Sequence, residues 1–169
     1  MTIWLRLLAC LAVLIASGAQ AQDRATTSGL SLGVGAGHSS AGLGAHIHYY
    51  FQLPDERWRL SAHAGVGVIG YVMFDGEAEG RVGVAGGLMA AFGRRHRLVL
   101  DVLAAPFQGS GETGERMKLY YGIGALVGYE WMARYGLSVR TAIGAAYCPG
   151  DGGSFGPAID LVLLGYKFW

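Results

Sequence analysis

The residues from Ala41 to Leu53, AGLGAHIHYYFQL, alternate strictly between two kinds of side chain. Odd-numbered positions are apolar or aromatic, and even-numbered positions hold glycine or a residue with a polar group. A period of two residues is typical of a β-strand with two different faces. The stretch is also long, because strands of soluble proteins have a mode of about 5–6 residues and bilayer-crossing strands need ~9–11. The pattern therefore predicts a strand with lipid on one face and a polar interior on the other.

The same alternation recurs along the rest of the chain. An even number of strands is expected for a closed bacterial barrel, with short periplasmic turns and longer external loops. The connections after the second, fourth and sixth expected strands are short, and three of the four on the other side are longer. We therefore predict an all-β fold, a transmembrane up-and-down antiparallel β-barrel of about eight strands. The expected strands are Ser28–Gly37, Ala41–Leu53, Trp58–Val72, Gly80–Gly93, Arg97–Phe107, Met117–Trp131, Tyr135–Tyr147 and Pro157–Trp169.

The composition agrees with a membrane barrel. Charged residues make up 15% of the chain, against about 25% in soluble domains. The 29 glycines alternate with apolar residues, as expected for the inner face of a narrow barrel. A net charge of +1 offers no basic excess for binding nucleic acid.

The first 21 residues are predicted to be a cleaved signal peptide. One positive charge, Arg6, precedes the apolar run Leu7–Ile15, and Ala19-Gln20-Ala21 fits a cleavage site. We expect a mature chain with a short N-terminal lead at residues 22–27 and an outer-membrane barrel at residues 28–169. Cleavage would leave Cys148 as the only cysteine, which excludes an intramolecular disulfide.

The end of the chain alternates again, with an aromatic terminus formed by Tyr166, Phe168 and Trp169. This ending resembles the assembly signal of bacterial outer-membrane proteins, which the barrel-assembly machinery reads during biogenesis. With the signal peptide and the eight-strand pattern, the chain resembles the small barrels typified by OmpX and the membrane domain of OmpA. The resemblance implies Sec-type export to the outer membrane of a Gram-negative-type bacterium. It also implies contact with outer-membrane lipids and lipopolysaccharide, and no cofactor.

A cluster of histidines is expected inside this barrel. In the hairpin that follows Leu53, His48 falls opposite His63, and His46 lies on the same face. Three imidazoles facing one lumen could bind a transition metal. The spacing matches no metal signature, so we favour a polar packing network with Tyr50 and Tyr71.

A second candidate site is the connection His38-Ser39-Ser40. The pair His38 and Ser40 resembles the His-x-Ser of the PagL family of lipid A deacylases, in which the histidine activates the serine. The acids considered as a third member, Glu77 and Glu79, lie in a different connection, and a turn of this composition is ordinary. We therefore favour a structural turn over a catalytic pair.

The third candidate is the set of charges expected on the inner face. Buried charges must be paired or hydrated, so the preferred interpretation is a core of internal ion pairs. The expected pairs are Asp101 with Arg97 or Arg140, and Glu130 with Arg134 or Lys167. The alternative is the lining of a narrow channel. The set consists of Arg59, Arg97, Asp101, Lys118, Glu130, Arg140 and Lys167.

Taken together, the residues predict an integral outer-membrane barrel with a structural or surface-interaction role and no enzymatic activity. The first alternative is a narrow channel for small solutes or ions. The second is a membrane enzyme that modifies the acyl chains of lipid A or phospholipid.

Overall fold

The computed structural model describes residues 28–55, 57–72, 78–109, 118–149 and 153–168. The predicted signal peptide, the N-terminal lead and Trp169 lie outside the described residues, as do residues 73–77, 110–116 and 150–152 of the longer predicted connections. Within the described ranges, no helix has the length and apolar character needed to cross a bilayer.

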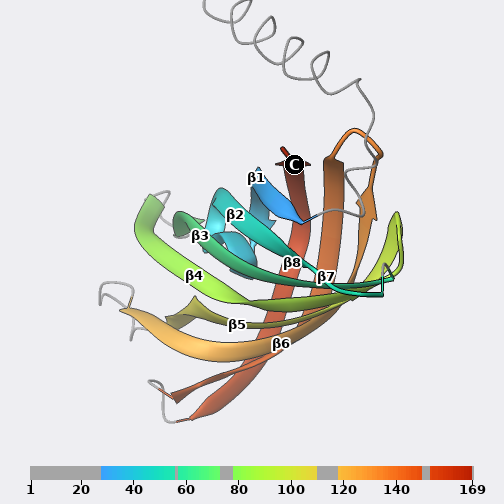
Figure 1. Ribbon diagram of the computed structural model, residues 1–169. Coiled ribbons are helices and arrows are strands. Elements are labelled where there is room, and N and C mark those ends of the chain that lie inside the picture. Colours follow the sequence, from blue (N-terminus) through green and yellow to red (C-terminus); the bar gives the residue numbers. More distant parts are fainter. Residues whose placement is uncertain (1–27, 56, 73–77, 110–117, 150–152, 169) are drawn as a thin grey trace, which may run out of the picture.

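Eight antiparallel strands form a closed barrel in which each strand pairs with its neighbours in sequence and β8 pairs with β1 (Figure 1). The predicted fold class is therefore confirmed, and the predicted strand ends differ from the observed ones by a few residues. The strands are β1 (Gly29–Gly37), β2 (Gly42–Gln52), β3 (Trp58–Val72), β4 (Ala78–Phe92), β5 (His96–Gly109), β6 (Lys118–Met132), β7 (Leu137–Cys148) and β8 (Ser154–Lys167).

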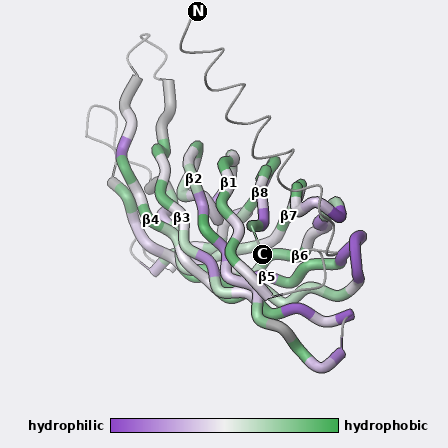
Figure 2. The backbone as a smooth tube through the Cα atoms, turned by 45° about the horizontal axis from the view of Figure 1, so that its top comes forward, coloured by the Kyte–Doolittle hydropathy of each residue, from purple (hydrophilic) through white to green (hydrophobic). Residues whose placement is uncertain are grey.

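The two faces of the strands differ as their alternation requires. Figure 2 shows hydrophobic residues along all the strands, with paler or hydrophilic residues between them. The large apolar side chains point outward, and Leu43 and Val82 are 73% and 71% exposed. Most polar and charged side chains of the strands point inward and are buried, whereas His96 and Thr141 are exposed. Soluble proteins place apolar side chains inside and polar ones outside, so this distribution is reversed. It is the distribution expected for a barrel in lipid.

A bulge in β8 changes which of its residues face the lumen. The pairing with β7 runs through Arg140↔Leu163 but resumes at Ala142↔Asp160. Leu161 and Val162 are consequently both outward, at 66% and 47% exposed. An uninterrupted period of two would place Asp160 on the outer face with Val162, whereas the bulge turns Asp160 inward, where it is fully buried.

The connection between β1 and β2 folds into the barrel rather than capping its rim. His38–Ser40 forms a short 3₁₀ turn, η1, and Ala41 follows in the left-handed region at φ 53°. Ser39, Ser40 and Ala41 are fully buried. Two glycines of β3 leave room for this turn, because a Cβ at Gly65 would lie 2.2 Å from the Ser39 carbonyl oxygen and one at Gly67 would lie 2.3 Å from that of Ser40. We call η1 the plug.

The seam between β4 and β5 is paired over only part of its length. The ladder runs from Phe92↔Leu98 to Gly86↔Ala104, and beyond it the two strands diverge toward their loop ends (Figure 1). Pro106, which has no N–H, lies in the divergent part of β5. The Val84 N–H instead donates to the Tyr121 hydroxyl at 3.3 Å, so a β6 side chain supplies an acceptor where the ladder has ended.

We expect Gly65→Ala to destabilise the barrel by about 1–3 kcal/mol, because the added methyl group collides with the backbone of the plug. The matched control is Gly156→Ala in β8, where a Cβ would meet nothing within 4 Å. Urea unfolding of both variants in lipid vesicles, followed by tryptophan fluorescence, measures the difference. Equal unfolding midpoints for the two variants would show that β3 does not confine the plug.

Candidate functional site

The lumen of the barrel is filled with charged side chains that are shielded from solvent. Each is at most 3% exposed, so each must find a partner inside the protein to be tolerated. They come from β3, β5, β6, β7 and β8, and they include all the predicted lumen charges except Lys118, whose side chain lies outside the described structure. The buried set is Arg59, Arg97, Asp101, Glu130, Arg140, Asp160 and Lys167.

One group of these residues holds the plug in place, and we call Ser39, His63, Asp101, Arg140 and Asp160 the plug cluster. The Ser39 N–H donates to Asp160 Oδ1 at 3.0 Å, and the Ser39 hydroxyl lies 2.7 Å from Asp160 Oδ2. Arg140 Nη2 donates to the same Oδ2 at 2.9 Å and to the Ser39 hydroxyl oxygen at 2.7 Å. The plug is therefore bound to the wall by charge-assisted hydrogen bonds, which are the stronger kind.

The plug cluster continues to the opposite wall through a second carboxylate. Asp101 Oδ2 lies 3.4 Å from Arg140 Nη2, and Asp101 Oδ1 lies 2.8 Å from His63 Nε2. Two carboxylates thus share one guanidinium, and the hydroxyl of Ser39 and the imidazole of His63 add further hydrogen bonds. Asp101 with Arg140 is one of the ion pairs expected from the sequence. Arg97, the other expected partner of Asp101, instead forms an ion pair with Glu130, a pairing that was not expected.

A second group of buried charges surrounds Glu130. Arg97 Nη1 donates to Glu130 Oε2 at 2.8 Å, and the Tyr50 hydroxyl donates to Glu130 Oε1 at 2.8 Å. Lys167 Nζ lies 5.3 Å from the centre of the Tyr50 ring, within the range of a cation–π contact. Both oxygens of this carboxylate are satisfied, which offsets part of the cost of its burial.

The predicted histidine cluster contacts both groups, through His63 in the plug cluster and through His48, which stacks on Tyr50. The register pairs His48 with His63, and their rings stack with centroids 4.9 Å apart. The ring of His46 meets that of His48 edge-on at 5.2 Å. His63 is hydrogen-bonded to Asp101, and the described part of the chain holds no group of three side chains placed to bind a metal ion. Tyr50 stacks on His48 at 5.8 Å, while the side chain of Tyr71 lies outside the description.

The structure gives His38 and Ser40 separate partners. His38 Nδ1 lies 3.0 Å from the backbone of Ile159, and its ring packs against Phe107 with centroids 4.7 Å apart. The buried Ser40 hydroxyl lies within 3.2 Å of three backbone carbonyl oxygens, those of Gly35, Gly37 and Gly42. Among the described residues no hydrogen bond joins the two side chains, so they are not arranged as base and nucleophile.

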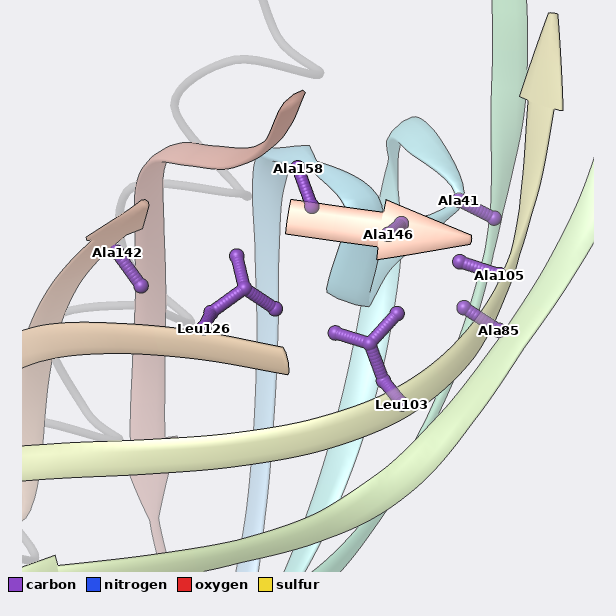
Figure 3. Close-up of a cluster of buried hydrophobic side chains, with 8 residues drawn as sticks. All are labelled: Ala41, Ala85, Leu103, Ala105, Leu126, Ala142, Ala146 and Ala158. Carbon is purple, nitrogen blue, oxygen red and sulfur yellow. The ribbon is translucent and has the colours of Figure 1, made fainter. Parts of the chain in front are cut away.

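An apolar layer completes the filling of the lumen. Mostly small side chains from the five strands β4 to β8 and from the residue after the plug converge there, as Figure 3 shows. Phe107 packs against this layer. Small side chains let opposite walls of a narrow barrel meet without a void. The layer consists of Ala41, Ala85, Leu103, Ala105, Leu126, Ala142, Ala146 and Ala158.

The end of β8 closes the barrel against the first strand. The Phe168 N–H donates to the Leu30 carbonyl at 2.8 Å, and the Lys167 N–H donates to the Gly136 carbonyl at 2.9 Å. The rings of Tyr166 and Phe168 meet edge-on at 5.4 Å. Two residues of the predicted assembly signal therefore lie where the last strand joins β1.

Two members of the plug cluster, Ser39 and Asp160, were not among the predicted site residues. Ser39 looks like an ordinary turn residue, and nothing in its surroundings reveals that the turn folds inward. Asp160 does carry a signal, because it stands alone with its charge in the apolar run Ala158–Leu164. The alternation of β8 would place this carboxylate on the lipid-facing side, where a charge raises the free energy of the folded protein. The sequence therefore indicates a bulge at this position.

Two solved structures are similar to this barrel. The outer membrane protein Ail of Yersinia pestis, in a phospholipid bilayer nanodisc, is 12% identical with a TM-score of 0.45, covering 84% of this chain and 100% of that one. The E. coli outer membrane protein W is 14% identical with a TM-score of 0.41, covering 84% of this chain and 98% of that one. No family model and no curated protein sequence matches the chain. The assignment of the fold rests on the strand pairing itself.

We expect Asp160→Asn to destabilise the barrel by about 3 kcal/mol, because it leaves Arg140 buried with half of its countercharge and weakens the attachment of the plug. The matched control is Asp55→Asn, a turn residue whose oxygen accepts from the exposed Arg57 N–H and whose change should stay within about 0.5 kcal/mol. The measurement is the urea concentration at the unfolding midpoint of each variant, compared with that of the wild type. If the midpoints of the two variants coincide, the ion pair does not hold the plug.

Proposed function

We propose that this protein is an integral outer-membrane barrel with a closed lumen, serving a structural or surface-interaction role rather than a catalytic one. The observation that carries the proposal is the combination of an apolar outer face with an interior filled by the plug and by buried ion pairs. The apolar outer face supports a location in the membrane. The filled interior supports a lumen that solutes do not cross.

The outer face supports a place in a membrane. Large apolar side chains are exposed on all eight strands, far beyond the apolar patches that soluble proteins tolerate. Aromatic residues gather toward the ends with short turns, as in the girdles of outer-membrane barrels. The girdle residues are Tyr49, Phe51, Trp58, Phe92, Tyr129 and Tyr135, and Trp58 packs on Phe92 with centroids 4.9 Å apart.

The interior argues against the channel alternative. An ion crossing the lumen would have to separate Arg140 from Asp160 and Arg97 from Glu130, both at hydrogen-bonding distance and shielded from water. Breaking a buried pair costs about 3–5 kcal/mol when one partner is left uncompensated. The plug itself also stands in the path, with Ser39 and Ser40 fully buried.

The same geometry gives little support to lipid acyl chemistry. A serine nucleophile needs a base within hydrogen-bonding reach of its hydroxyl. The hydroxyl of Ser40 faces three backbone carbonyls, and His38 is bound to the backbone of Ile159. The β3–β4 and β5–β6 hairpins are long. A role in presenting these two hairpins at the cell surface fits the structure better than lipid acyl chemistry does.

Single-molecule recording tests the closed lumen. We expect the wild-type protein to be silent in planar bilayers, and the double variant Ser39→Gly, Asp160→Ala to show small stepwise conductances, because the plug loses its attachment to β8. The matched control is Asp55→Ala, which alters an exposed turn.

Each variant is first checked for folding by comparing unboiled and boiled samples on a gel. Stepwise conductance of the wild type would overturn the closed lumen in favour of a channel. A wild-type protein that stays in the soluble fraction and migrates alike before and after boiling would overturn the membrane location.

A further inference from the structure

The wall of the barrel is lowest at the β1–β2 hairpin. β1 ends at Gly37 and β2 begins at Gly42, because the plug turns inward between them. On one side, Leu43 pairs with Val68 and β3 continues to Val72. On the other side, Gly37 pairs with Asp160, and β8 has already begun at Ser154. At about 3.3 Å per residue, the neighbouring strands extend roughly 13–20 Å further along their own length. We call this step in the rim the notch.

A pocket of about 670 Å³ lies at the notch. This volume is within the ~300–1,000 Å³ typical of sites for small ligands. Its inner lining is apolar, with Ile69 from β3, Pro106 and Phe107 from β5, and Ile159 from β8. Among the described residues that line it there is no Asp, Glu, Lys or Arg, and His38 is the one with an ionisable side chain.

The lip of the pocket belongs to the outer face of the barrel. Leu43, Val68 and Leu161 line the pocket, and all three are also among the exposed apolar side chains of the outer face. Leu43 and Val68 are cross-strand partners, so they form a continuous apolar step at the notch. The apolar surface therefore runs from the outer wall, over the low hairpin and into the pocket.

The floor of the pocket is closed. His38 lines it, and the next three residues, Ser39 to Ala41, are fully buried beneath the rim. The plug cluster holds that turn to the wall through Asp160 and Arg140. The pocket is thus a blind site that a molecule can occupy but cannot pass through.

We propose that this pocket binds one acyl chain of a membrane lipid, which enters sideways from the surrounding leaflet through the notch. The inference rests on the proposed membrane location, since the lip must face lipid. An occupant entering from lipid is favoured because the apolar lining is continuous with the outer face.

Because the acyl chain leaves one apolar medium for another, the hydrophobic effect contributes little to its binding. Its binding comes from dispersion contacts with Ile69, Phe107 and their neighbours, so we expect a chain that exchanges rather than a permanent ligand.

Photolabelling from within the bilayer tests this site. The full chain is refolded into phosphatidylcholine vesicles that contain a few per cent of a phosphatidylcholine with a diazirine at the end of one acyl chain. After illumination, modified residues are located by mass spectrometry. We expect adducts on the outer face, for example at Val82 and Leu88, and also inside the pocket at Phe107 or Ile159.

Matched variants separate the pocket from the outer face. Ile69→Trp fills the pocket and should reduce the Phe107 and Ile159 adducts several-fold while leaving those on the outer face unchanged. Leu88→Trp adds the same side chain to the outer face of β4 and should leave the pocket adducts intact. Ala36→Phe, at the edge of the same pocket, replaces Ile69→Trp if the latter fails to give a heat-modifiable band on a gel.

Three results would overturn the proposal. The first is labelling of the outer face without any pocket adduct in the wild type. The second is pocket adducts that persist in the filled variant. The third is labelling of the pocket by a short diazirine alkanol added from water but not by the phospholipid, which would assign the pocket to a soluble apolar molecule. Loss of all labelling, on the outer face as well, would instead contradict the membrane location on which the proposal rests.

Discussion

The hydrogen-bonded ion pair between Arg140 and Asp160 is the interaction on which the interior of this barrel depends. Asp160 also accepts hydrogen bonds from the backbone and the hydroxyl of Ser39, so one carboxylate joins the wall to the plug. Burying these charges is costly, and the cost is offset only because every member of the cluster has a partner at short range. The lumen is therefore filled by a polar network whose parts depend on one another.

The inward turn of the plug explains two properties of the molecule at once. It fills the lumen, which makes conduction costly, and it shortens β1 and β2, which lowers the wall on one side. The bulge in β8 belongs to the same arrangement, since it brings Asp160 to face Ser39 and turns Leu161 toward the lip of the pocket. A closed interior and a laterally open pocket thus have a common structural origin.

Much of this architecture was predictable because a barrel wall is made of repeated local patterns. The alternation in Ala41–Leu53 assigns Leu43 to the outer face and His48 to the lumen, and the turn after Leu53 sets the register that pairs His48 with His63. The face of Asp160 was not predictable in this way, because one bulged residue reverses the phase. The position of Ser39 was not predictable either, because a three-residue connection carries no pattern that shows which way it folds.

The sequence alone determined the strands, their two faces, the order of pairing and most of the charges that face inward, because each follows from a period of two residues and short turns. The tertiary structure decided which inward groups meet. Ser39 and Asp160 are 121 positions apart, and Arg140 reaches Ser39 across 101. Contacts across a lumen depend on strand tilt, on the stagger of the barrel and on a single bulge, and none of these is encoded by local periodicity.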